Sequence, residues 1–102
     1  MALTQLTDTE QNGHKKAFGE LVADWRRNAG LTQLALAEGL GVTRGFIQAI
    51  EDGRKRIALD RMEVYAHALR KPVDELYEEH IRGHDPELYW FLRRLWQPNN
   101  QS

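Results

Sequence analysis

The stretch from residue 31 to residue 53 constrains the fold more than any other part of the chain, because it predicts two short helices joined by a tight turn. Thr32 can cap the first helix and Thr43 the second, since a threonine hydroxyl accepts from a backbone N–H that the helix leaves without a partner. Gly39 and Gly41 interrupt the helical pattern where the backbone must turn sharply. The spacing therefore predicts a compact helical hairpin.

Two helices joined in this way are the parts of a helix-turn-helix, whose second helix enters the major groove of DNA. Small, apolar and capping residues fall in register along the stretch: Thr32, Gln33, Leu36, Ala37, Gly41, Val42, Thr43, Ile47, Ile50, Glu51 and Gly53. On these residues the chain resembles the Cro/repressor (XRE-type) helix-turn-helix family, and the resemblance extends over residues 15–77. It implies an all-α fold, namely a five-helix lambda-repressor-like domain that binds double-stranded DNA.

Length and composition exclude several other classes of protein. A chain of 102 residues has no room for a second core of useful size. It contains no cysteine, and its only serine is the last residue, so neither a thiol nor a serine nucleophile is expected. It has no apolar run long enough for a membrane helix and no signal-peptide pattern at its start. We therefore expect a cytoplasmic protein that is not an enzyme and needs no cofactor.

The charges are unevenly distributed, although the net charge is only −1. Residues 14–71 carry 11 Lys and Arg against 7 Asp and Glu, whereas the rest of the chain carries 3 against 8. The part that bears the motif is therefore the basic part, as binding to a polyanion requires.

Three segments are expected along the chain. Residues 1–13 are polar and predict a flexible N-terminal arm, and residues 14–78 would form the DNA-binding domain. The first helix of that domain should run from Lys15 to Ala29. The family resemblance further implies that Arg26, near its end, forms a structural ion pair with Glu51. Residues 79–102 would then form a C-terminal extension.

The second helix of the motif, residues 44–51, is expected to read bases. Because Ile47 and Ile50 should face inward, the periodicity turns the other side of the helix toward DNA. Arg44 could donate to a guanine or bind a phosphate, and Phe46 could touch a thymine methyl or pack against the protein. The expected base contacts are Arg44, Gly45, Phe46, Gln48 and Ala49.

Phosphate contacts are expected on both sides of this helix. The resemblance assigns one to Gln33, at the N-terminus of the preceding helix, where free N–H groups favour an anion. Three adjacent cations follow the recognition helix and suit a polyanion rather than a particular base. The full set is Gln33, Thr43, Arg54, Lys55 and Arg56.

The remainder of the domain should contain a helix at residues 59–69, with Leu59 on its core side, and a short helix from Pro72 to Tyr77. Residues 78–85 are polar and are expected to form a connection. His80 and His84 are four apart, as two metal ligands on one helical face could be, but we favour a solvated pair and expect no metal site.

One further helix, at residues 87–96, is predicted beyond the family domain. It is unusually aromatic, so it either packs on its own domain or forms a dimer interface, and we favour the dimer. The expected interface consists of Leu88, Tyr89, Trp90, Phe91, Leu92, Leu95 and Trp96.

Two functions follow from these expectations. The first is a homodimeric transcriptional repressor that reads a palindromic operator through helix 44–51. The second is an antitoxin or anti-regulator whose C-terminal segment binds a protein partner, with DNA binding reduced to autoregulation. The operator and the regulated genes are not specified by the sequence.

Overall fold

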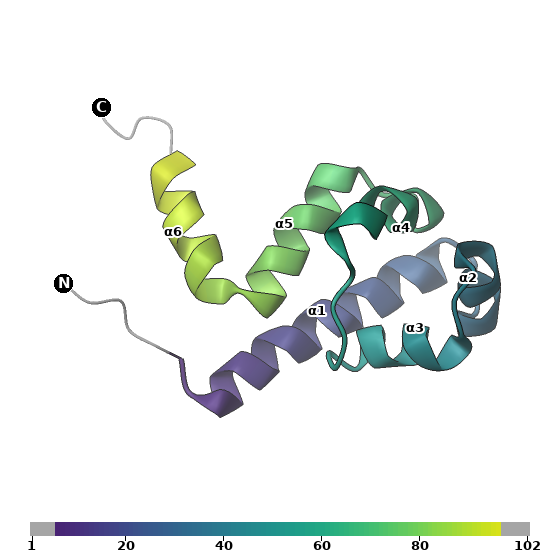
Figure 1. Ribbon diagram of the computed structural model, residues 1–102, viewed down its shortest axis with the longest axis horizontal. Coiled ribbons are helices and arrows are strands. Elements are labelled where there is room, and N and C mark those ends of the chain that lie inside the picture. The colour runs from purple at the N-terminus through teal and green to yellow at the C-terminus, as the bar shows by residue number, and fades with distance from the viewer. Residues whose placement is uncertain (1–5, 97–102) are drawn as a thin grey trace.

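The computed structural model describes residues 6–96, which form six α-helices and one 3-10 helix and contain no strand (Figure 1). The all-α prediction is therefore confirmed. Residues 1–5, part of the expected arm, and residues 97–102 lie outside the described range. The elements are α1 (Asp8–Asn28), α2 (Gln33–Leu40), α3 (Arg44–Glu51), η1 (Leu59–Arg61), α4 (Met62–Ala68), α5 (Val73–His84) and α6 (Pro86–Trp96).

Helix α1 begins at Asp8 rather than at Lys15, so the expectation of a flexible arm is wrong for residues 8–13. The cause is a capping box. The Thr7 hydroxyl accepts from the Glu10 backbone N–H at 3.1 Å, and the Glu10 carboxylate accepts from the Thr7 N–H at 2.9 Å. Both orphan donors are thereby satisfied, and the helix starts two turns earlier than its apolar stripe alone predicts.

The hairpin of α2 and α3 follows the sequence-based expectation closely. The Thr32 hydroxyl accepts from Ala35 N–H and the Thr43 hydroxyl from Phe46 N–H, each at 3.0 Å. Gly41 ends α2 with a φ of 72°, in the left-handed region that side chains disfavour. Helix α3 has the predicted bounds, whereas α2 continues through Gly39, one of the two glycines expected to interrupt it, and ends at Leu40.

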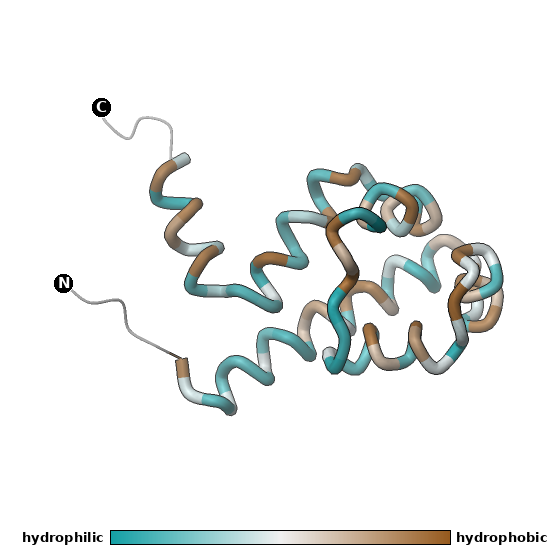
Figure 2. The backbone as a smooth tube through the Cα atoms, viewed as in Figure 1, coloured by the Kyte–Doolittle hydropathy of each residue, from teal (hydrophilic) through white to brown (hydrophobic). Residues whose placement is uncertain are grey.

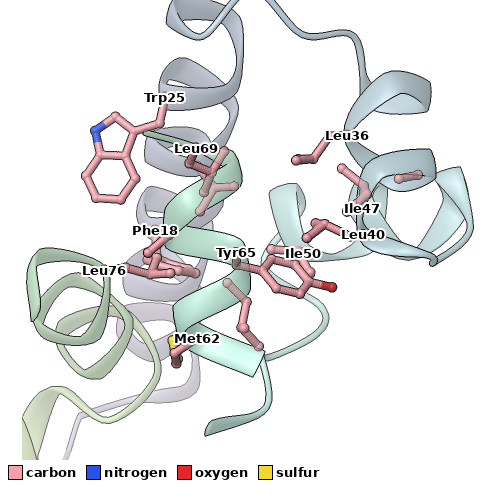
Figure 3. Packing of buried hydrophobic residues seen from close by; sticks show 14 residues of the cluster. Phe18, Trp25, Leu36, Leu40, Ile47, Ile50, Met62, Tyr65, Leu69 and Leu76 are labelled. Atoms are coloured by element: carbon pink, nitrogen blue, oxygen red, sulfur yellow. The ribbon is translucent and has the colours of Figure 1, made fainter. Parts of the chain in front are cut away.

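One apolar core lies where α1 to α5 meet, and Figure 3 shows the side chains of its members pointing toward one another. Helix α1 crosses α3 at Gly19. A Cβ at this position would lie 2.1 Å from the Glu51 carbonyl oxygen, so no larger residue fits without moving the helices apart. The largest fully buried side chains are Val22, Leu36, Ile47, Ile50, Met62, Leu69 and Leu76.

The fourth helix is divided into η1 and α4, and one of its expected core residues is exposed. Met62, Ala66 and Leu69 are buried as predicted, but the side chain of Leu59 is 67% exposed. Leu59 stands in the 3-10 turn, whose three-residue period turns it away from the face that the α-helical residues bury.

Helix α5 continues to His84, so the expected polar connection over residues 78–85 is wrong. His80 and His84 are buried rather than solvated, and their rings lie 5.2 and 5.5 Å from the ring of Phe18. Gly83 allows this packing, since a Cβ there would lie 2.5 Å from the Phe18 Cβ. Among residues 6–96, no group of three or more His, Cys, Asp or Glu side chains could hold a metal.

The two buried histidines have strongly lowered pKa values. His80 Nε2 accepts from the Ile57 backbone N–H at 3.1 Å, while His84 Nε2 has no partner among the described residues. Burial is the main cause that lowers the pKa of each ring from 6.5 to about 4. Nearby cations add to this effect (Arg56 for both rings, and Lys15 for His84), whereas Asp85 opposes it.

We expect the folded state to lose stability as pH falls from about 6.5 toward about 4. In that window the unfolded chain takes up protons on His80 and His84, while the buried rings stay neutral. His84→Leu should flatten the pH dependence, because its Nε2 makes no hydrogen bond that leucine would lose. His67→Gln, at an exposed position of α4, is the comparison variant. Denaturant midpoints at several pH values decide the matter, and parallel profiles for His84→Leu and the parent would contradict the prediction.

Helix α6 stands at the end of the molecule opposite the helical hairpin (Figure 1). Hydrophobic bands recur along α6, whereas the N-terminal half of α1 is mostly hydrophilic (Figure 2). Within the part of the chain that the structure describes, every helix is too short or too polar to cross a membrane.

Candidate nucleic-acid interface

Helix α3 presents one exposed face. Ile47 and Ile50 are each 1% exposed and hold the opposite face against the core. Arg44, Gly45 and Gln48 are exposed, so three of the five expected base-contacting residues share a free surface. Gly45 adds no side chain to this surface, so another molecule can closely approach the backbone of α3 at this residue.

Two of the expected base contacts lie elsewhere. Phe46 is half-buried and packs against the core, which is the second of the two roles expected for it. Ala49 is only 5% exposed, so the expectation that it faces outward is wrong. The helical period alone turns Ala49 outward, but the chain folds back after α3. The N–H groups of Arg54 and Lys55 donate to the Ala49 carbonyl oxygen at 2.8 and 3.2 Å.

A hollow of about 690 Å³ lies beside the N-terminal end of α3. Its lining comes from the end of α1, the start of α2 and Arg44, and includes Arg27 and Gln33. The start of α2 supplies backbone N–H groups that have no partner within the helix. Cationic side chains and helix N–H groups together suit a phosphate. Thr43 is exposed nearby, with its hydroxyl oxygen capping α3.

A buried ion pair holds α3 against α1. Arg26 Nε donates to Glu51 Oε2 at 2.6 Å and Nη2 donates to Oε1 at 3.2 Å, and both side chains are less than a tenth exposed. The remaining groups are also satisfied, because Arg26 Nη1 donates to the Leu31 carbonyl oxygen and Gln33 Nε2 donates to Glu51 Oε1. The structure thus brings Arg26 and Glu51 together, and it joins Gln33 to the same network.

The basic loop after α3 divides into residues with different partners. Arg54 pairs with Asp52 at 3.0 Å, in an exposed contact of the kind that contributes little to stability. Lys55 is exposed. Arg56 forms a bidentate contact with Asp85, with Nη1–Oδ2 at 2.8 Å and Nη2–Oδ1 at 2.9 Å. This contact raises the pKa of Arg56 and lowers the pKa of Asp85. A phosphate would have to compete with the Asp85 carboxylate for Arg56.

The same loop is tied to the junction between α5 and α6. Arg56 Nη2 also donates to the His84 carbonyl oxygen at 3.3 Å, and the next residue, Ile57, donates its N–H to His80. Sequence reasoning did not assign a role to Asp85 or His80. The usable signal was the continued helical spacing of Leu76, His80 and His84, which extends the buried face of α5.

The expected dimer residues of α6 lie on three sides of the helix. Tyr89 and Leu92 are partly buried toward α5. Trp90 contacts α1, where its ring lies edge-on to that of His14 with centroids 5.9 Å apart. Trp90 is nevertheless exposed, as are Leu88, Phe91, Leu95 and Trp96.

Comparisons with known proteins agree with this architecture. A family described as helix-turn-helix matches residues 22–76. The chain is 35% identical over 91 residues to an uncharacterized transcriptional regulator in the ATPase CF(0) region of Rhodospirillum rubrum, covering 88% of this chain and 83% of that protein.

Two solved structures of the clp gene regulator ClgR from Corynebacterium glutamicum also resemble it. One has 28% identity and a TM-score of 0.56 and covers 66% of this chain and 87% of its own. The other has 24% identity and a TM-score of 0.58, covers 86% and 96%, and shows a shared fold.

Proposed function

This chain belongs to the helix-turn-helix family and is a transcriptional regulator with a DNA-binding domain, and from that premise we propose that it is a homodimeric repressor of a palindromic operator. Each protomer would insert α3 into the major groove. A single domain covers one half-site, so two copies would bind half-sites with centres about 34 Å apart, one turn of DNA. The protein acts in the cytoplasm in this proposal.

One observation carries the proposal: the exposed face of α3 lies between two groups of side chains that are able to bind phosphates. Arg44 and Gln48 are the side chains available to base edges. Gln33, Thr43 and Arg27 would hold the backbone at one end of α3, and Arg54 and Lys55 at the other. Phosphate contacts on both sides of a recognition helix set its register on the duplex.

Selection of binding sites from random DNA tests this function directly, and we expect a two-fold symmetric consensus. Arg44→Ala should then relax the preference at one base pair in each half-site by about 1–3 kcal/mol. Gln33→Ala is a useful comparison, because a phosphate contact carries no base preference. An equal loss of affinity on all sequences would assign Arg44 to a phosphate, and failure to select any sequence would overturn the proposal.

The basic loop should contribute to the salt dependence of binding unequally. Each lost phosphate contact lowers the slope of log K against log salt by about 0.9. We therefore expect this loss for Lys55→Ala and for Arg54→Ala, on specific and random DNA alike. Arg56→Ala is the matched control and should change the slope less, because Asp85 and the His84 carbonyl oxygen hold that guanidinium through three hydrogen bonds, whereas Arg54 makes one exposed contact with Asp52. Titrations at several salt concentrations measure the slopes, and three equal changes would mean that Arg56 leaves Asp85 when DNA binds.

The antitoxin or anti-regulator function remains the second candidate. The observation that favours it is the apolar surface of α6, with Leu95 63% and Trp96 71% exposed. A partner protein could cover this surface instead of a second copy. A purified protein that stays monomeric and selects no DNA sequence would favour this function over the repressor.

A further inference from the structure

Helix α6 has one face that no other part of residues 6–96 covers. Its side toward α5 carries Tyr89 and Leu92, and its side toward α1 carries Trp90. The third side carries Leu88, Phe91 and Leu95, which are spaced three and four residues apart and so form one line on the helix. These side chains are 47%, 46% and 63% exposed, and we name them the α6 stripe.

An open groove runs between α5 and α6 beside this stripe. Its volume is about 500 Å³, within the range in which proteins bury apolar groups of ligands. Figure 1 shows α5 and α6 diverging from the junction that joins them. Most of the groove's lining is apolar or aromatic, with Val73, Tyr77 and Ile81 from α5 and Tyr89, Leu92 and Trp96 from α6, and three charged residues complete it, namely Asp74, Glu78 and Arg93.

We propose that the α6 stripe of one copy fills the α5–α6 groove of a second copy, and that the second copy does the same in return. This inference rests on the homodimer of the proposed function and specifies which surfaces meet. Stripe and groove belong to the same helix, so a two-fold axis brings each stripe to the other groove in a single closed interface. A stripe packed only against a stripe would leave both aromatic grooves open to water.

The charges around the two surfaces are complementary. The α5 rim of the groove carries Asp74 and Glu78, of which Glu78 already pairs with Arg82 at 3.6 Å, and the α6 rim carries Arg93. Arg94 lies one helical turn from Trp90 and borders the stripe at Phe91. Within residues 6–96, neither Asp74 nor Arg94 forms an ion pair. In the dimer with each stripe in the other copy's groove, Arg94 would approach the acidic α5 rim of that copy. This contact favours a second copy over an apolar small molecule as the occupant of the groove.

Complementation between two variants of the full chain tests whether each stripe fills the groove of the other copy. The stripe variant is Phe91→Glu with Leu95→Glu, at two exposed positions that leave the monomer intact. The groove variant is Ile81→Glu, and Trp96→Glu provides a second one at an exposed position should Ile81→Glu unfold. Each variant alone should weaken self-association by about thirtyfold or more, since a few central side chains carry most of the binding energy.

Sedimentation velocity of the parent, each variant and an equal mixture gives the decisive result. In the mixture, the intact stripe of the groove variant meets the intact groove of the stripe variant, so we expect dimers that neither variant forms alone. Groove variants that dimerise like the parent, or a mixture that stays monomeric, would overturn the proposed contact between stripe and groove. Neither result would contradict the homodimer. A monomeric parent would overturn the homodimer itself.

Discussion

Replacing Glu51 with alanine will lower the free energy of unfolding by about 3–5 kcal/mol, because it leaves the Arg26 guanidinium buried without its counter-charge. Arg26 loses two charge-assisted hydrogen bonds, at 2.6 and 3.2 Å, and keeps only the one to the Leu31 carbonyl oxygen. Gln33 loses its partner in the same substitution. Urea denaturation of the parent and the variant measures the change.

An exposed ion pair within α1, the helix of Arg26, supplies the matched control. Arg27 and Asp24 lie 2.8 Å apart, nearly as close as the buried pair, but both side chains are about 60% exposed. Asp24→Ala should therefore cost less than about 1 kcal/mol. A double-mutant cycle with Arg26→Met should show coupling between Arg26 and Glu51, since removing both charges leaves none stranded. Additive effects of the two substitutions would remove the ion pair as the cause.

Gly19→Ala is expected to destabilise the fold by about 3 kcal/mol or more, at the upper end of overpacking effects. The added Cβ would lie 2.1 Å from the Glu51 carbonyl oxygen and 2.8 Å from that of Ile50. Both obstacles are backbone atoms, so no side-chain rotation relieves the clash and α1 must move away from α3. That movement would also separate Arg26 from Glu51 and weaken DNA binding. Denaturant midpoints and binding titrations measure the two effects.

The control for this substitution lies in the same helix. Gly13 is exposed, and a Cβ added there would meet nothing within 4 Å, so Gly13→Ala should stabilise α1 by about 0.5–1 kcal/mol through helix propensity alone. Opposite signs for the two glycine-to-alanine changes would identify the helix crossing as the cause. A neutral Gly19→Ala would show that α1 and α3 can separate at little cost.

The parts of the fold that could be predicted from sequence are those set by neighbouring residues. The caps at Thr32 and Thr43 and the turn at Gly41 act within three or four positions, and they set the ends of α2 and α3 nearly as expected. Even the early start of α1 has a local signal, the capping box of Thr7 and Glu10, which the polar composition of residues 1–13 obscured. The positions of Arg26 and Glu51 followed from the family resemblance, and the structure supplies the geometry of their contact.

The candidate site was predictable only in part, because exposure depends on what folds back over a residue. Helical periodicity puts Ala49 on the outer face of α3, yet the residue is buried, and its carbonyl oxygen accepts from the turn that follows the helix. Composition marks Arg56 as one of three equivalent cations. The approach of Asp85, 29 positions away in sequence, gives it a different partner from Arg54 and Lys55.

The sequence by itself determined the helical class, the bounds of α3 and the basic character of the segments around it. The reason is that helix caps, apolar periodicity and charge depend on residues that are close in sequence. Only the tertiary structure decided that α5 reaches His84, that His80 and His84 are buried against Phe18, and that Arg56 is held by Asp85. The physical reason for the two buried histidines is the close crossing of α1 and α5 at Gly83, which buries polar side chains that composition alone assigns to water. Arg56 and Asp85 meet because the fold brings together residues 29 positions apart.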